Sequence, residues 1–113
     1  MKAMKAIKDV NEEINEVATL PKPKAAEMLG RAAALLHERG QNYDKPEGER
    51  SMARTVSAFN AITGRDLSEA EGWLFMQQLK QVRLFTRSGY HADSAEDNIA
   101  YAALMAEAKE REV

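Results

Sequence analysis

Two helix-spaced groups of charged residues combine side chains that suit a phosphorylated ligand. Lys80 and Arg83 are three residues apart, so both side chains project from one face of a helix. Asp93, Asp97 and Tyr101 follow at intervals of four residues and line one edge of a second helix. Cations bind phosphate oxygens, and carboxylate oxygens are the ligands that Mg²⁺ prefers. The two helices therefore suggest a phosphate-binding group beside a metal-binding group.

Two polar loops supply further candidates, one between residues 41 and 48 and the other between residues 86 and 91. Their tyrosine rings suit stacking on a base or bonding to a sugar, and their acidic neighbours suit a cation. We predict as ligand-binding residues Tyr43, Asp44, Arg50, Lys80, Arg83, Tyr90, His91 and Tyr101, and as ligands of a Mg²⁺ ion Asp93, Asp97, Glu47 and Glu49.

The same residues have structural interpretations. Asp93 is well placed to cap a helix, and Lys80 and Arg83 are typical of cations that flank an apolar stripe. Tyr101 can bury its ring in the core and leave its hydroxyl at the surface. Cations that face carboxylates form either a structural salt-bridge network or a ligand site, and the sequence leaves both open.

The elements that must position these residues are all helical. Apolar residues recur at helical spacing in residues 2–18, 24–39, 49–63 and 69–85, and a fifth helix follows from residue 93 or 94. No stretch alternates apolar and polar residues as a strand does. We predict an all-α bundle of about five helices. The expected inner-facing residues of the last three helices are Met52, Val56, Phe59 and Ile62; Trp73, Met76, Leu79, Val82 and Phe85; and Ile99, Ala102, Ala103 and Ala106.

Capping signals mark where the last two helices begin. Ser68 and Glu71 form a capping box at the start of the fourth helix. Asp93 with Glu96, or Ser94 with Asp97, would cap the fifth helix. Because only a short loop separates these helices, we expect them to pair in antiparallel fashion and to bring Lys80 toward Asp97.

The N-terminal segment carries a separate apolar seam. Ile7, Val10, Ile14 and Val17 follow a 3-4-3 spacing, and the prolines near residue 22 end this pattern. Such a stripe needs a partner helix from the same chain or a second copy. We therefore predict that residues 1–22 are an oligomerisation element of a homo-oligomer and that residues 23–113 are the helical core domain.

Composition excludes several classes of protein. The 113 residues carry a formal net charge of −2 and contain no cysteine, which excludes a disulfide scaffold and a cysteine-ligated zinc site. Near-neutral charge argues against broad nucleic-acid binding. No apolar run approaches the roughly 18 residues of a membrane span, so we expect a soluble, cytoplasmic protein without membrane contact.

Four stretches resemble a family of small phage and prophage proteins: YDKPEGERSM, AFNAITGRDLSEAEGWLFM, LKQVRLF and YHADSAEDNIAYAALMAE. The resemblance covers about residues 25–108. The order of a loop tyrosine, Lys-x-x-Arg and Asp-Ser-x-x-Asp-x-x-x-Tyr is also similar to phage nucleotide-modification-associated domains and to MazG-type nucleotide pyrophosphohydrolases. The latter hold Mg²⁺ with Glu-x-x-Glu and Glu-x-x-Asp pairs, whereas this chain offers Asp93 and Asp97 at another spacing.

The resemblance implies a phage-type protein that binds a nucleotide or a related phosphorylated ligand. On this interpretation the protein acts either by sequestration of the ligand or by its Mg²⁺-dependent hydrolysis, so whether the protein is an enzyme stays open. The alternative is a non-enzymatic helical interaction module that docks on a host or phage protein. In that case the polar clusters only hold the loops in place.

Overall fold

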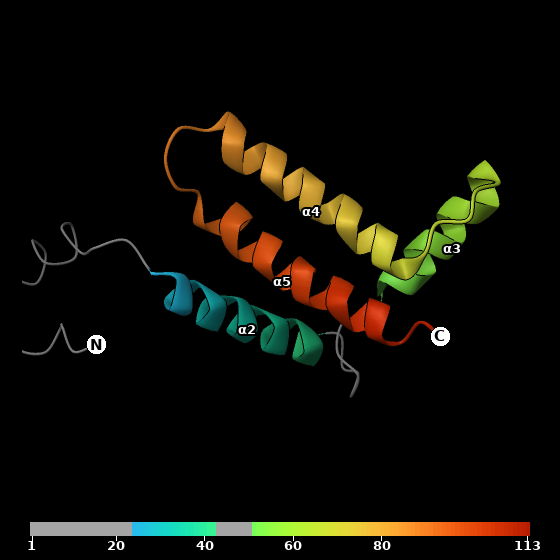
Figure 1. Cartoon of the computed structure of the whole chain (residues 1–113), viewed down its shortest axis with the longest axis horizontal. Coiled ribbons are helices and arrows are strands. Elements are labelled where there is room, and N and C mark those ends of the chain that lie inside the picture. The colour runs from blue at the N-terminus through green and yellow to red at the C-terminus, as the bar shows by residue number, and fades with distance from the viewer. Residues whose placement is uncertain (1–23, 43–50) are drawn as a thin grey trace, which may run out of the picture.

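A computed structural model describes residues 24–42 and 51–113 of the chain (Figure 1). These residues form four α-helices: α2 (Ala25–Asn42), α3 (Ser51–Thr63), α4 (Glu69–Thr86) and α5 (Ala92–Glu110). The prediction of an all-helical fold is confirmed for the described part of the chain. The expected count of five is not reached there, since only four helices are present. The helix predicted over residues 2–18, with its oligomerisation role, lies outside the described residues.

Helices α4 and α5 form an antiparallel pair, as the short loop between them predicts (Figure 1). The capping box at the start of α4 is confirmed, because the Ser68 hydroxyl accepts from the Glu71 amide at 3.0 Å and the Glu71 carboxylate accepts from the Ser68 amide at 2.9 Å. Gly89, in the connecting loop, has a φ of 77°, a conformation that glycine adopts without strain.

The start of α5 differs from the prediction. The N-cap residue is His91, and neither Asp93 nor Ser94 caps the helix. The Ser94 hydroxyl instead lies 2.7 Å from Nδ1 of His91. Ala92 and Asp93 already have helical geometry, so α5 begins earlier than its acidic residues suggest.

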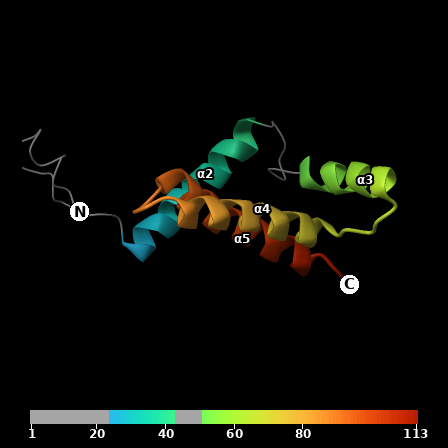
Figure 2. The same cartoon turned by 90° about the horizontal axis from the view of Figure 1, so that it is seen from above.

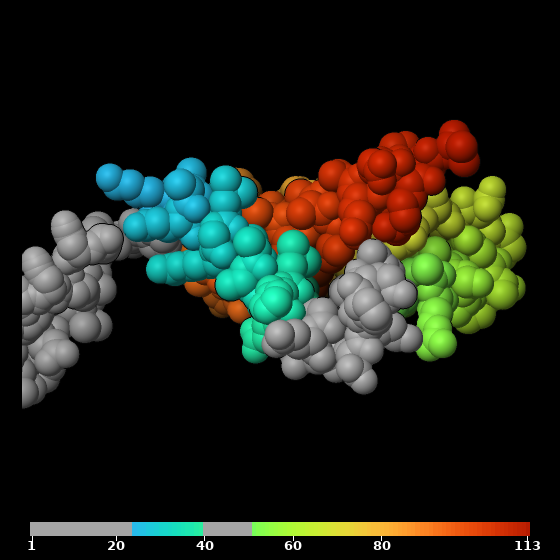
Figure 3. Space-filling model, turned by 90° about the horizontal axis from the view of Figure 1, so that it is seen from below, coloured from blue at the N-terminus to red at the C-terminus, as the bar shows by residue number. Residues whose placement is uncertain are grey.

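Helix α2 lies along α5 and covers its N-terminal part, whereas the last turns of α5 extend beyond it (Figures 2 and 3). An ion pair of 3.6 Å between Arg31 and Glu96 joins the two helices. Helix α3 packs on α4 alone among the helices described. Helix α5 is therefore flanked by α2 and α4, and α3 packs at one end of α4.

The buried core contains residues from α3, α4 and α5, with Leu36 of α2 packed against it. For several residues the prediction of an inner-facing position is wrong. Phe59, Ile62, Val82 and Phe85 are exposed, because α3 reaches α4 only with its first turns and the outer face of α4 is uncovered. In α5, the buried side belongs to Tyr101 and its helical neighbours, and the expected alanine face is largely at the surface. The core cluster is Met52, Val56, Ala70, Trp73, Tyr101, Leu104 and Ala108.

Gly72 of α4 lies directly against side chains of α3. A β-carbon at this position would lie 2.5 Å from Sδ of Met52 and 2.7 Å from Cγ1 of Val56. Both distances are far below van der Waals contact, and the β-branched Val56 has little freedom to move aside. The absence of a side chain at position 72 is therefore a condition for the contact between α3 and α4.

We expect the Gly72→Ala substitution to destabilise the protein. The overpacking costs about 1–3 kcal/mol, which exceeds the gain of up to about 1 kcal/mol from replacing a helical glycine by alanine. Urea unfolding followed by circular dichroism measures the change. Gly30→Ala is the matched control, because no atom lies within 4 Å of its added β-carbon and the substitution should stabilise α2. Equal stabilisation by both substitutions would contradict this account of the contact.

No helix in residues 24–42 or 51–113 is long and apolar enough to cross a membrane.

Candidate ligand-binding cluster

Asp97 is the centre of a cluster of charged residues from three helices. Its Oδ2 atom lies 2.8 Å from Nζ of Lys80 on α4, and its Oδ1 atom lies 3.1 Å from a guanidinium nitrogen of Arg39 on α2. The side chains of Asp97 and Lys80 are 9% and 11% exposed, and that of Arg39 is 24% exposed. We call these three residues the Asp97 cluster.

The register of the helix pair places Lys80 and Asp97 opposite each other. One residue further along each helix, the side-chain amide of Gln81 donates to Oδ1 of Asn98 at 3.3 Å. Arg39 reaches the same carboxylate from the last turns of α2, 58 residues away in the sequence. A single carboxylate on the middle helix thus joins both of its neighbours.

Aromatic rings lie beside the charges. Tyr101, one turn after Asp97, stacks on Trp73 with ring centroids 5.3 Å apart and planes 30° apart. The guanidinium carbon of Arg39 lies 5.5 Å from the centre of the Tyr101 ring, a distance at which a cation is attracted to the ring face. Arg39 is therefore held by both a carboxylate and a ring.

The Asp97 cluster carries an excess of positive charge. Lys80 and Arg39 contribute two cations and Asp97 one anion, which leaves one positive charge in a poorly solvated place. Burying charges costs several kcal/mol per ion before pairing, and apolar residues of similar size often stabilise a core equally well. Apolar residues could therefore join the three helices with at least equal stability. The additional positive charge of the cluster suits an anionic group.

Two buried polar atoms lack a hydrogen-bond partner within the described part of the chain. One is Oε1 of Gln77, on the same side of α4 as Lys80 and Trp73, and the other is the hydroxyl of Tyr90. Buried polar atoms are normally paired, so each has capacity for one further bond. Gln77 places such capacity one turn from the Asp97 cluster.

The structure brings together three of the predicted residues, Lys80, Asp97 and Tyr101. Arg83 and Asp93 are exposed, and neither takes part in the ion pairs of Asp97. Tyr90 and His91 are half-buried in the loop before α5. The predicted residues that lie outside the described part of the chain are Tyr43, Asp44, Glu47, Glu49 and Arg50.

Sequence reasoning missed Arg39, Trp73 and Gln77 as members of this region. Trp73 was predicted to be a core residue, which it is, but its stacking on Tyr101 was not expected. Gln77 has a usable signal, because it lies three residues before Lys80 and shares its side of the helix. Arg39 has none, since only the packing of α2 on α5 brings it to Asp97.

Among the described residues there is no complete set of ligands for the predicted Mg²⁺ ion. Both oxygens of Asp97 already accept bonds from cations, and Asp93 is exposed one turn earlier. Within residues 24–42 and 51–113, no group of three or more His, Cys, Asp or Glu side chains is placed to hold a metal ion. Two of the four predicted ligands, Glu47 and Glu49, lie outside the described residues.

A family model described as a domain of unknown function, DUF6378, matches residues 27–109, which include all three members of the Asp97 cluster. This range agrees closely with the 25–108 over which the sequence resembles a known family. Neither the curated proteins nor the solved structures include a match. The phage origin and the similarity to nucleotide-processing domains stay predictions.

Proposed function

Since the chain belongs to the DUF6378 family, whose description assigns no activity, we propose from the Asp97 cluster that the protein binds a nucleotide or a related phosphorylated ligand. The observation that carries this proposal is the convergence of two cations on one buried carboxylate, with a net positive charge. A phosphate group would neutralise that charge through charge-assisted hydrogen bonds.

Arg39 is the residue best placed to meet the phosphate. It is the most exposed member of the cluster, and its planar guanidinium carries five N–H donors, one of which donates to Oδ1 of Asp97. Lys80 lies deeper and acts through its charge. The Tyr101 ring holds the guanidinium in place, so a ligand does not have to order a free arginine side chain.

Sequestration is the mode of action that the described residues support. Hydrolysis of a phosphoanhydride needs an activated water. Both carboxylate oxygens of Asp97, which would have to activate that water or hold its metal ion, already accept from Lys80 and Arg39. Nucleotides are abundant in the cytoplasm, and a phage-type protein of this kind would act there in the host cell.

A second function, docking on a host or phage protein without any ligand, is favoured by a different observation. The outer face of α4 exposes large apolar side chains, among them Phe75 and Phe85, that no other described element covers. A pure docking module has no reason to respond to phosphorylated compounds, so ligand binding separates the two functions.

We expect nucleotides to raise the melting temperature of the full chain. A ligand at 100 times its Kd stabilises the folded state by about 2.7 kcal/mol. Thermal melting with nucleoside mono-, di- and triphosphates, pyrophosphate and inorganic phosphate, each with and without Mg²⁺, identifies the compound class. Chromatography of the nucleotide after incubation shows whether it is returned unchanged, as sequestration requires, or converted to products, as hydrolysis requires.

The variant that tests the assignment is Arg39→Gln. It should lose most of the ligand-induced shift, which is measured relative to its own melting temperature without ligand. Arg31→Gln is the matched control, because Arg31 is also on α2 and forms an ion pair with Glu96, but it does not bind Asp97. The absence of a shift with every compound, or a full shift in Arg39→Gln, would refute the proposal.

A further inference from the structure

The outer face of α4 has no partner in the part of the chain that the structure describes. Leu74, Phe75, Val82 and Phe85 are 45%, 70%, 59% and 84% exposed, and they share the side of the helix that points away from α5. Gln78 lies among them and is also exposed. We call these five residues the α4 face.

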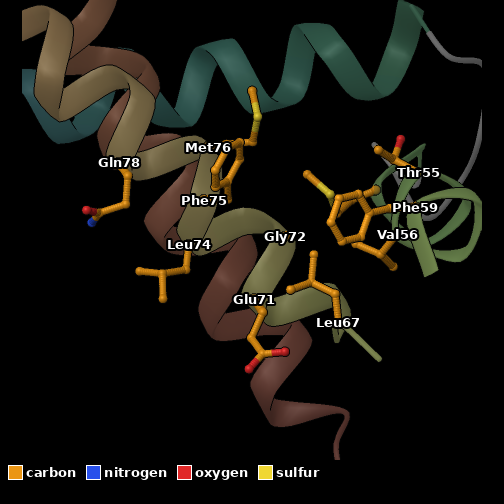
Figure 4. A pocket seen from close by; sticks show the side chains of 11 residues that line it. Thr55, Val56, Phe59, Leu67, Glu71, Gly72, Leu74, Phe75, Met76 and Gln78 are labelled. Atoms are coloured by element: carbon orange, nitrogen blue, oxygen red, sulfur yellow. The ribbon is translucent and has the colours of Figure 1, made fainter. Parts of the chain in front are cut away.

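An apolar groove adjoins the N-terminal half of the α4 face. It has a volume of about 550 Å³ and lies between α3 and α4, with Gly72 among its lining residues (Figure 4). Phe59 and Leu67 line one side, and Leu74 and Phe75 line the other. The groove is open to solvent on one side, and its mostly apolar lining suits an apolar side chain.

The spacing of the α4 face is nearly symmetric about Gln78. Leu74 lies four residues before Gln78 and Val82 four residues after it, while Glu71 and Phe85 lie seven residues before and after. When two identical helices pack in antiparallel fashion around a two-fold axis at Gln78, Leu74 of each copy meets Val82 of the other, and Glu71 meets Phe85. Such self-complementarity is what a two-fold interface requires.

We propose that the α4 face binds the same face of a second copy of this chain in a two-fold dimer. In this register Phe85 of the second copy lies next to Glu71 and Leu74, at the mouth of the groove between α3 and α4. The exposed Phe85 ring of each copy can therefore enter the groove of the other copy, so that both grooves are occupied in the dimer. This inference does not depend on ligand binding, because Arg39, Lys80 and Asp97 face α5 and α2.

Charge and area agree with this arrangement. The first turn of α4 carries Glu69 and Glu71, and its last turn carries Arg83, with Arg87 at the C-cap. Antiparallel packing therefore brings an acidic end of one copy near a basic end of the other. At about 200 Å² for a fully exposed aromatic side chain, Phe75 and Phe85 together expose roughly 300 Å². Leu74 and Val82, together with Phe59 of the neighbouring α3, add to this apolar area. A stable interface buries about 800 Å² per partner, so the polar residues around these side chains have to supply the remainder.

The mass of the full chain in solution tests this proposal. Sedimentation equilibrium between about 1 and 100 µM should give twice the chain mass of 12.6 kDa at the upper concentrations. Phe85→Ser should raise the Kd of the dimer by about 30-fold or more, as the loss of a central anchor does. Leu29→Ser is the matched control, because Leu29 is 60% exposed on α2, away from α4, and should leave the Kd unchanged.

A single introduced cysteine tests the register, since the chain has none of its own. Gln78→Cys lies at the two-fold axis and should give a covalent dimer with a short bifunctional maleimide, whereas Ala33→Cys, exposed on α2, should not. A Val10→Asp, Ile14→Asp double variant of the full chain should remain dimeric. A wild-type mass of 12.6 kDa at every concentration, equal cross-linking at both cysteines, or a monomeric double variant would each overturn the proposal.

Discussion

Replacing Asp97 with asparagine should destabilise the protein by about 3–5 kcal/mol, the usual cost of leaving a buried charge without its partner. The substitution preserves the shape of the side chain but removes the negative charge. Lys80 is then a nearly buried cation without its carboxylate, because within residues 24–42 and 51–113 its ion pair is with Asp97. Arg39 suffers less, since it is partly exposed and keeps the Tyr101 ring. Urea unfolding followed by circular dichroism measures the loss.

Two further variants separate this effect from a general sensitivity of α5. Asp93→Asn changes an exposed carboxylate one turn earlier and should shift the free energy of unfolding by less than about 0.5 kcal/mol. The double variant Asp97→Asn, Lys80→Met removes both buried charges and should recover much of the loss. If the double variant is as unstable as the sum of its single variants, the pair is not coupled as the geometry requires.

Truncation of Trp73 to alanine should have an effect of similar size, about 3–5 kcal/mol. The side chain is 3% exposed, and it fills the space between α4 and α5 while its ring stacks on Tyr101. The loss combines the transfer of a large apolar surface to water with the cavity that remains. Because Trp73 is the one tryptophan of the chain, unfolding of this variant has to be followed by circular dichroism rather than by tryptophan fluorescence.

The control for Trp73→Ala is Leu29→Ala, which truncates a large apolar side chain that is 60% exposed on α2. It should change the free energy of unfolding by less than about 0.5 kcal/mol. Trp73→Phe should fall between the two, since phenylalanine retains a ring against Tyr101 but leaves part of the space empty. A loss below about 1 kcal/mol for Trp73→Ala would show that the stacked pair is not central to the core.

The sequence was sufficient to predict the helices and one important contact. Helical periodicity and the capping box at Ser68 locate α4, and the short loop after it predicts the antiparallel partner. From these two facts, the approach of Lys80 to Asp97 follows. The observed distance of 2.8 Å between Nζ and Oδ2 confirms it.

Periodicity was less able to predict which side of a helix is buried. It counts apolar residues, and on α5 the buried side contains the polar residues Ser94 and Asp97 together with Tyr101. On α4 the periodicity is present on two sides, and Val82 and Phe85 belong to the exposed one. The contribution of Arg39 was beyond reach for a different reason, because no local pattern relates two residues that meet only through the packing of α2.

The position of Asp97 between two cations also bears on the order in which the chain assembles. Lys80 and Asp97 are 17 residues apart and meet across a short hairpin, like the adjacent pair Gln81 and Asn98. Arg39 and Asp97 are 58 residues apart. Closing the longer loop costs about 1 kcal/mol more chain entropy. Contacts that are local in sequence form faster. We therefore expect the hairpin of α4 and α5 to form first, with Asp97 already paired with Lys80, and α2 to pack onto this charged site afterwards.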